Sequence, residues 1–296
     1  MPQVRAALTP EAVRKLGSME LRARAMVEGH FSGRHRSHFR GASVEFADHR
    51  EYNPGDETRH IDWKVYGRRE RLVVKQFDAE TNLDVHLLVD ASASMDYGEP
   101  VRKLDYAAYL AAGLAYLAIR QRDAVSLIVF DSQVRLHLPA QTRPAHLQTV
   151  YESLEGLAPG GETRISRALE LAAGAIKRRG LVVLLSDLLD DVEPTLRALS
   201  YFRHRGHDVM VLQVMDHAEL AFDFRGLTEF RDLETGERLV TDPRALRGEY
   251  LQALQGFLNG VREGCRRQAI DHELLDTSRP FDAALTAYLG RRARVG

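Results

Sequence analysis

Short apolar runs alternate with longer segments of helical periodicity from residue 83 to the end of the chain. Such runs, bounded by polar residues, are typical of strands buried on both faces of a parallel sheet. The expected strands are 83–90, 124–131, 134–138, 181–187, 208–216 and 272–275, and the expected helices are 103–121, 145–157, 166–179, 192–204, 243–268 and 281–291. Their alternation predicts βαβ units, and therefore an α/β fold with a doubly wound, mostly parallel, Rossmann-like sheet. The strand at 134–138 alternates in polarity, which predicts an antiparallel edge strand.

The residues before this region have a different pattern. A capping threonine, a proline in the first turn and an acid at 9–11 predict a helix that runs to about Glu28 and is ended by Gly29. Glycine, proline, histidine and arginine are then frequent, and two short strands are expected at 44–46 and 72–77. This part of the chain is therefore expected to be a helix followed by a loop-rich, partly β segment.

These two patterns predict the organisation of the chain. We expect an N-terminal helical and loop- or β-rich extension at 1–80 and an α/β domain at 81–296. Within the domain, the segment 228–241 is expected to form a hairpin insertion with Thr235 and Gly236 at the turn.

Composition narrows the class of protein. The 296 residues suffice for a sizeable core, and 41 basic against 42 acidic residues leave no overall bias toward nucleic acid or membrane. Cys265 is the single cysteine, so an intrachain disulfide and a cysteine-based zinc site are excluded, and we expect a buried structural thiol. The weakly apolar stretch at 106–119 is too short to span a bilayer, and the N-terminus has no signal-peptide pattern. A soluble, cytoplasmic protein is expected.

Candidate chemistry is concentrated where the expected strands end. Asp90, Ser92 and Ser94 follow the first strand at alternate positions, Asp187 ends a strand expected to lie beside it, and Thr163 follows a Gly-Gly pair in a loop. In open α/β sheets, ligands bind in the crevice beyond the carboxyl ends of the strands. Two carboxylates and three hydroxyls are oxygen donors that suit Mg²⁺ or Mn²⁺. Taken alone, the Asp-Ser-Ser triplet favours a local role instead, because Asp and Ser also end strands and cap helices.

The five residues in this chain order resemble the metal-ion-dependent adhesion site of von Willebrand factor A-type domains. The resemblance implies that the hydroxyls of Ser92, Ser94 and Thr163 contact the ion, while Asp90 and Asp187 act directly or through water. It also implies that one coordination position stays free. A partner protein would fill that position with a carboxylate.

The segment before the domain carries a signature made of Arg50, Tyr52, Pro54, Gly55, Asp56, Arg59, Ile61, Asp62 and Trp63. This signature resembles that of a second, narrower family, called domain of unknown function 58, in which it precedes an A-type domain. The chain departs from the signature at Glu57, where a second Asp is common, and at Gly67, where Ala is common. The resemblance implies a chaperone-like adaptor that works with a MoxR-type AAA+ ATPase and its client protein. We expect such an adaptor to have no enzymatic activity.

A structural role is the first interpretation of the signature residues. Residues 53–56 form a strong turn signal, and Arg59, Asp62 and Trp63 are expected to fix the extension by ion pairing and burial. The alternative, a second metal centre made by Asp56, His60 and Asp62, has no tight metal-ligand spacing in its favour.

Two other function classes stay open. Magnesium or manganese can activate water, so a metal-dependent hydrolase, a phosphatase or nuclease, is the alternative to an adaptor. A haloacid-dehalogenase-type phosphotransferase would need an aspartate at the position of Ser92, and the chain contains no GxSxG, Walker, HExxH or CxxC motif. Nucleic-acid binding through the basic run at 34–40 is a weaker alternative, because the overall charge is balanced.

Overall fold

The computed structural model describes residues 8–33, 48–52, 63–69, 71–76, 83–161 and 163–295. The chain forms two compact units, one made of Met1–His35 with Leu83–Gly296 and the other of Arg36–Asn82. These units do not follow the predicted division at residue 80, because the first helices pack with the α/β domain. The predicted strand at 44–46, the basic run at 34–40 and most of the signature lie outside the described residues.

A six-stranded sheet forms the centre of the larger unit, with the strand order β10-β7-β6-β3-β4-β5. The strands are β3 Asp84–Asp90, β4 Ala124–Phe130, β5 Val134–Gln141, β6 Gly180–Ser186, β7 Asp208–Met215 and β10 Asp271–Asp276. Every neighbouring pair is parallel except β4 with β5. All residues of β3, β4 and β6 are buried, as continuous apolar strands require when helices cover both faces. The predicted doubly wound, mostly parallel sheet with an antiparallel edge is confirmed.

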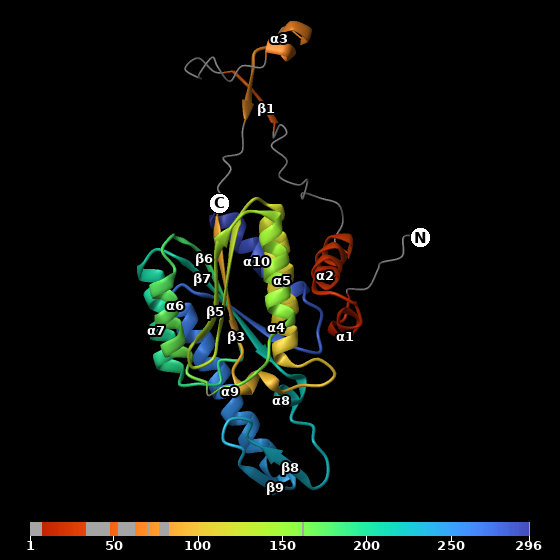
Figure 1. The fold of residues 1–296 in the computed structure, drawn as a ribbon, viewed down its shortest axis with the longest axis vertical. Helices are drawn as coiled ribbons and strands as arrows, with labels where there is room; N and C mark the ends of the chain where they lie inside the picture. The colour runs from red at the N-terminus through yellow and green to blue at the C-terminus, as the bar shows by residue number, and fades with distance from the viewer. Residues whose placement is uncertain are drawn as a thin grey trace. The chain divides into compact units, whose positions relative to one another are not determined.

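Helices cover both faces of this sheet (Figure 1). One face carries α4 Lys103–Arg120, α5 Pro144–Glu155 and α10 Asp282–Val295, and the other carries α6 Ile165–Ala175, α7 Val192–His204 and α9 Pro243–Arg267. Each face of the sheet has its own hydrophobic core, and successive residues of a strand point into opposite cores. In β3, Leu87 and Val89 pack with α4, whereas Leu88 packs on the opposite face with α6 and α7.

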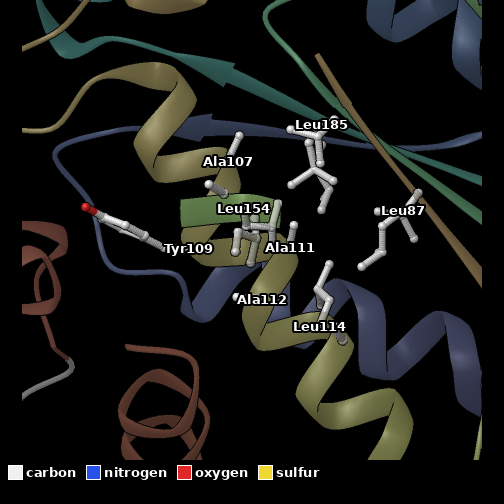
Figure 2. Close-up of a cluster of buried hydrophobic side chains, with 14 of the residues drawn as sticks. Leu87, Ala107, Tyr109, Ala111, Ala112, Leu114, Leu154 and Leu185 are labelled. Atoms are coloured by element: carbon white, nitrogen blue, oxygen red, sulfur yellow. The ribbon is translucent and has the colours of Figure 1, made fainter. Parts of the chain in front are cut away.

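Small side chains bring α4 close to the sheet. Figure 2 shows Leu87 and Leu185 of the sheet beside Ala107, Ala111 and Leu114 of α4. Almost every residue of α4 is buried, including Lys103 at its first position. Close packing of this helix fixes its N-terminus next to the carboxyl end of β3, where the candidate site lies.

Two helices precede the sheet in place of the single predicted one. The helix α1 Pro10–Arg14 begins with the hydroxyl of Thr9 accepting the N–H of Ala12 at 3.3 Å, as predicted. The chain then breaks, and α2 Met19–Gly33 begins after Ser18, whose hydroxyl accepts the N–H of Leu21 at 3.3 Å. The predicted continuous helix ending at Gly29 is therefore wrong, because a Gly-Ser pair at 17–18 interrupts it and a later glycine is tolerated inside α2.

The smaller unit contains two paired strands and a helix. The strand β1 Asp48–Glu51 pairs antiparallel with β2 Val73–Gln76, which confirms the strand predicted at 72–77, and α3 Trp63–Arg69 is a helix that the sequence pattern did not predict. Trp63 is 62% exposed and meets Tyr66 edge-on, with 6.1 Å between ring centroids. The predicted role of Trp63 in fixing the extension stays a prediction.

A short helix and a hairpin complete the larger unit. The helix α8 His217–Ala221 follows β7, and the strands β8 Thr228–Arg231 and β9 Arg238–Thr241 pair antiparallel, which confirms the predicted hairpin. Cys265 is buried and free, as predicted, and burial raises its pKa to about 12. None of the described helices is long and apolar enough to cross a membrane.

Candidate functional site

Two carboxylates lie at the same edge of the sheet because their strands are parallel neighbours. Asp90 is the last residue of β3 and Asp187 follows the last residue of β6, and the two strands pair up to Val89 with Leu185. Both side chains are completely buried, with 0% exposure. The predicted placement of these residues beside each other, at the carboxyl end of the sheet, is confirmed.

A loop from a distant part of the chain brings a third segment to this edge. The N–H of Gly160 donates to the carbonyl of Ala91 at 3.0 Å, and the N–H of Ala93 donates to the carbonyl of Gly161 at 3.2 Å. Gly161 has φ +79°, and a Cβ at this position would lie 2.8 Å from Oδ2 of Asp131. The positive φ and the closeness of the Asp131 side chain both favour glycine at this position.

Three hydroxyl groups meet as a result of this loop contact. The Oγ of Ser92 lies 3.1 Å from the Oγ of Ser94, which lies 3.5 Å from Oγ1 of Thr163. Ser94 belongs to a short 3₁₀ helix, Ala93–Asp96, that follows β3. The three predicted hydroxyl donors therefore form one row, although 69 residues separate the last two in the sequence.

Both carboxylates are held by hydrogen bonds. Asp90 accepts the N–H of Ser92 at 2.9 Å and the hydroxyl of Ser186 at 2.6 Å. Asp187 accepts the N–H of Leu189 at 3.1 Å. Burial, together with the negative charge of Asp187, raises the pKa of Asp90 above its usual range, although the bond from Ser186 opposes this. Ser186 is a contributor that the sequence pattern did not reveal.

A buried lysine completes the charged cluster. The Nζ of Lys103 lies 2.8 Å from Oδ2 of Asp187 and 2.7 Å from Oε1 of Glu219, and the lysine side chain has 0% exposure. Burial alone would lower the pKa of Lys103, but the two carboxylates outweigh burial and raise it, so the ammonium stays charged. Burial likewise raises the pKa of Glu219, against the opposing charge of Lys103.

Sequence reasoning missed Lys103 and Glu219 as members of the site. Lys103 was predicted only as the start of a helix. Glu219 stands three residues after Asp216, and the two form a capping box at the start of α8 in which the N–H of Asp216 donates to Glu219 at 2.9 Å. The Asp-x-x-Glu spacing is a sequence signal for the start of this helix. It does not indicate that the carboxylate of Glu219 lies beside Lys103.

The balance of charge in the cluster favours a cation. Asp90, Asp187 and Glu219 contribute three carboxylates, whereas Lys103 contributes one ammonium that is shared between the last two. The hydrogen bonds to Asp90 come from uncharged groups. Because buried charge is costly unless it is compensated, a divalent cation beside Asp90 and the hydroxyl row would stabilise this arrangement.

The donor set fits a hard divalent cation. In the described part of the chain, no group of three or more His, Cys, Asp or Glu side chains is placed to hold a metal ion. A cation at this edge would therefore depend on the hydroxyls of Ser92, Ser94 and Thr163 together with the carboxylates. All of these are oxygen donors, the type that Mg²⁺ and Mn²⁺ prefer.

The hairpin supplies one further carboxylate that the sequence pattern did not assign to the site. Oε1 of Glu234 accepts the N–H of Thr163 at 3.2 Å and also accepts the Thr163 hydroxyl. Glu234 lies between β8 and β9, in the turn of the predicted hairpin. The turn was predicted, but its contact with the hydroxyl row, across 71 residues of sequence, was not.

The family signature lies apart from this cluster in the sequence, and only part of it is described. Arg50 pairs with Val74 across β1 and β2, and the N–H of Tyr52 donates to the carbonyl of Leu72 at 3.0 Å. These contacts are structural, within the smaller unit. The signature residues Pro54, Gly55, Asp56, Arg59, Ile61 and Asp62, together with His60 of the alternative metal centre, lie outside the described residues.

Comparisons with known proteins agree with this fold. The "Uncharacterized protein Rv1480" of Mycobacterium tuberculosis (strain ATCC 25618 / H37Rv) is 27% identical over 291 residues, which cover 96% of this chain and 91% of the relative. The crystal structure of conserved hypothetical protein BatB from Bacteroides thetaiotaomicron is similar with a TM-score of 0.50 and 19% identity, over 72% of this chain and 99% of the other. An aerotolerance-related membrane protein from Bacteroides fragilis is similar with a TM-score of 0.51 and 20% identity, over 71% and 99%. The two structural likenesses concern the fold alone, and they agree with the doubly wound, mostly parallel α/β sheet. Because its family model matches residues 48–256, the chain belongs to the family described as "Protein of unknown function DUF58".

Proposed function

We propose that the chain is a metal-dependent protein-interaction module without enzymatic activity. In this proposal, Mg²⁺ or Mn²⁺ binds at the carboxyl end of β3 and an acidic side chain of a partner protein binds to the cation. The row formed by the hydroxyls of Ser92, Ser94 and Thr163, beside the buried carboxylate of Asp90, is the observation that carries the proposal.

The chemistry of the donors supports binding of a carboxylate. A divalent cation supplies a Lewis-acidic centre, which attracts an additional anionic ligand most strongly when its other ligands are neutral. Ser92, Ser94 and Thr163 are neutral donors, and Asp90 and Asp187 are held in place by backbone and hydroxyl hydrogen bonds. A cation bound by these side chains would have few negatively charged ligands. It would therefore accept the carboxylate of a partner residue as a further ligand.

The identity of the partner rests on the family resemblance rather than on the geometry. We propose that it is a MoxR-type AAA+ ATPase, or the client protein on which such an ATPase acts, and that the complex forms in the cytoplasm. An adaptor of this kind needs a contact that can be made and released. A carboxylate held through a divalent cation is such a contact, since it depends on the metal and on the partner's charge.

Co-purification tests this proposal. The chain is mixed with a MoxR-type ATPase from the same organism, with Mg²⁺ or with a chelator, and the retained ATPase is measured for the wild type, Ser92→Ala and Ser153→Ala. Ser153 is the matched control, because it lies on α5 and donates to the carbonyl of Thr149 at 2.8 Å. Binding should require Mg²⁺ and should be lost in Ser92→Ala alone. Equal retention by all three proteins with chelator present would contradict the metal bridge.

A further inference from the structure

The tip of the β8–β9 hairpin places a carboxylate on the hydroxyl row. The same oxygen of Glu234 accepts both the backbone N–H and the hydroxyl of Thr163. Thr163 is the end of the row that begins at Ser92. A carboxylate of the chain itself thus lies beside a donor of the proposed metal site, where a partner's acidic side chain is expected to enter.

The turn that carries Glu234 is locally ordered. The carboxylate of Asp232 accepts the N–H of Thr235 at 2.9 Å and that of Glu234 at 2.7 Å. These two bonds lower the pKa of Asp232, and the bond from Thr235 has the larger effect. The N–H of Asp232 donates to the carbonyl of Glu237 at 2.9 Å, and Gly236 has φ +76°. The backbone of Glu234 is therefore held by the turn itself and is presented in a defined direction.

The hairpin is anchored at its base and not at its tip. The ring of Phe230 stacks on Phe222 at 5.7 Å and meets Phe224 edge-on at 5.3 Å, while Phe222 stacks on Tyr250 of α9 at 4.1 Å. In contrast, residues 231–240 are all exposed, with Val240 at 57%. Little apolar area holds the tip down, so its position depends on the polar contact with Thr163.

Charge decides when this contact is favourable. Glu234 adds a negative charge beside a cluster that already has three carboxylates, Asp90, Asp187 and Glu219, against the ammonium of Lys103. Without a cation, repulsion between these charges weakens the contact of Glu234 with Thr163. With a divalent cation on the hydroxyl row, the same charge becomes attractive, because a carboxylate is a preferred ligand of Mg²⁺ and Mn²⁺.

We propose that Glu234 is a carboxylate ligand that the chain supplies to its own metal site, so that a bound cation draws the hairpin tip onto the site and a partner's acidic side chain binds by displacing it. This inference rests on the proposed function, because it requires that the site holds a divalent cation. It adds a residue of the chain to the ligand set and a step, release of the hairpin, to partner binding.

Two measurements on the purified full chain test the inference. The first is the affinity for Mn²⁺, measured by calorimetric titration for the wild type, Glu234→Gln, Ser92→Ala and Glu237→Gln. Glu237→Gln is the control, because Glu237 is exposed and lies in the same turn as Glu234. Glu234→Gln should weaken Mn²⁺ binding by at least about tenfold, the loss that is typical even for residues that only support a metal ligand. Glu237→Gln should bind Mn²⁺ as the wild type does.

The second measurement is hydrogen exchange of residues 228–241 with and without Mn²⁺. Exchange should slow on addition of the metal in the wild type and in Glu237→Gln, and it should not change in Glu234→Gln. If Mn²⁺ binds to the wild type but Glu234→Gln binds equally well and shows the same metal-dependent protection, Glu234 is not a ligand and the proposed function stands. If the wild type does not bind Mn²⁺ at all, both proposals are overturned.

Discussion

Replacement of Lys103 by methionine tests the charged cluster beside the site. Methionine keeps most of the volume of the side chain but removes the ammonium, which leaves Asp187 and Glu219 without their shared partner. Lys103 and Asp187 are both completely buried, and the two charge-assisted hydrogen bonds are 2.8 and 2.7 Å long. Removing one partner from a buried ion pair costs about 3–5 kcal/mol of unfolding free energy, because the remaining charge is left in a medium of low dielectric constant.

The expected loss is a large fraction of the stability of a domain, which is about 5–15 kcal/mol. Urea unfolding of Lys103→Met, followed by circular dichroism at pH 7 in the presence of a chelator, should therefore show a clearly lower midpoint than the wild type. The matched control is Lys15→Met, because Lys15 also pairs with a glutamate, Glu11, at 3.2 Å, but with 74% of its side chain exposed. An exposed pair of this kind contributes about 0–1 kcal/mol.

The comparison of the two variants can refute this reasoning. A loss of less than about 1 kcal/mol in Lys103→Met, equal to that of Lys15→Met, would mean that the lysine does not compensate buried charge. Mg²⁺ provides a further check, since a divalent cation would supply part of the missing positive charge. Addition of Mg²⁺ should recover more stability in Lys103→Met than in Lys15→Met.

Three other predictions concern pH, the glycine loop and catalysis. Burial lowers the pKa of His86 from its ordinary value of 6.5 to about 4, so the unfolded chain takes up this proton first as pH falls. Stability should be full above pH 6.5 and decrease toward pH 4, by up to about 3 kcal/mol, and urea unfolding of His86→Gln should show a weaker pH dependence than that of the exposed control His204→Gln. Gly161→Ala should cost about 1–2 kcal/mol from its positive φ, and should weaken Mn²⁺ binding in a calorimetric titration because the added Cβ would push the loop away from Asp131. A panel of phosphatase and nuclease substrates with Mg²⁺ or Mn²⁺ should give no turnover, whereas turnover that Asp187→Asn abolishes would favour a hydrolase instead.

Much of the fold could be predicted from the sequence because the strands are buried on both faces. The apolar runs of β3, β4 and β6 have no competing helical period, and the alternating polarity of β5 marked it as an edge. The helix break after α1 was missed because the Gly-Ser pair at 17–18 lies inside an otherwise helical pattern, in which a single glycine is often tolerated.

The candidate site was predictable where it depends on strand ends. Asp90 and Asp187 follow apolar strands, and parallel neighbours place their carboxyl ends at one edge. The remaining members depend on tertiary contacts that have no sequence period. Lys103 lies beside Asp187 because α4 packs closely on the sheet. Glu234 contacts Thr163 through the fold of the hairpin, although the two residues are 71 positions apart in the sequence.

Metal binding by the purified chain is the most direct test of the account. The protein is freed of metal with a chelator, and Mg²⁺ and Mn²⁺ are titrated calorimetrically into the wild type, Ser92→Ala and the control Ser153→Ala. The account predicts that the wild type and Ser153→Ala bind one divalent cation and that Ser92→Ala, which lacks a hydroxyl of the row, binds at least about tenfold more weakly. A wild type that binds neither cation, or a Ser92→Ala variant that binds as tightly as the wild type, would contradict it.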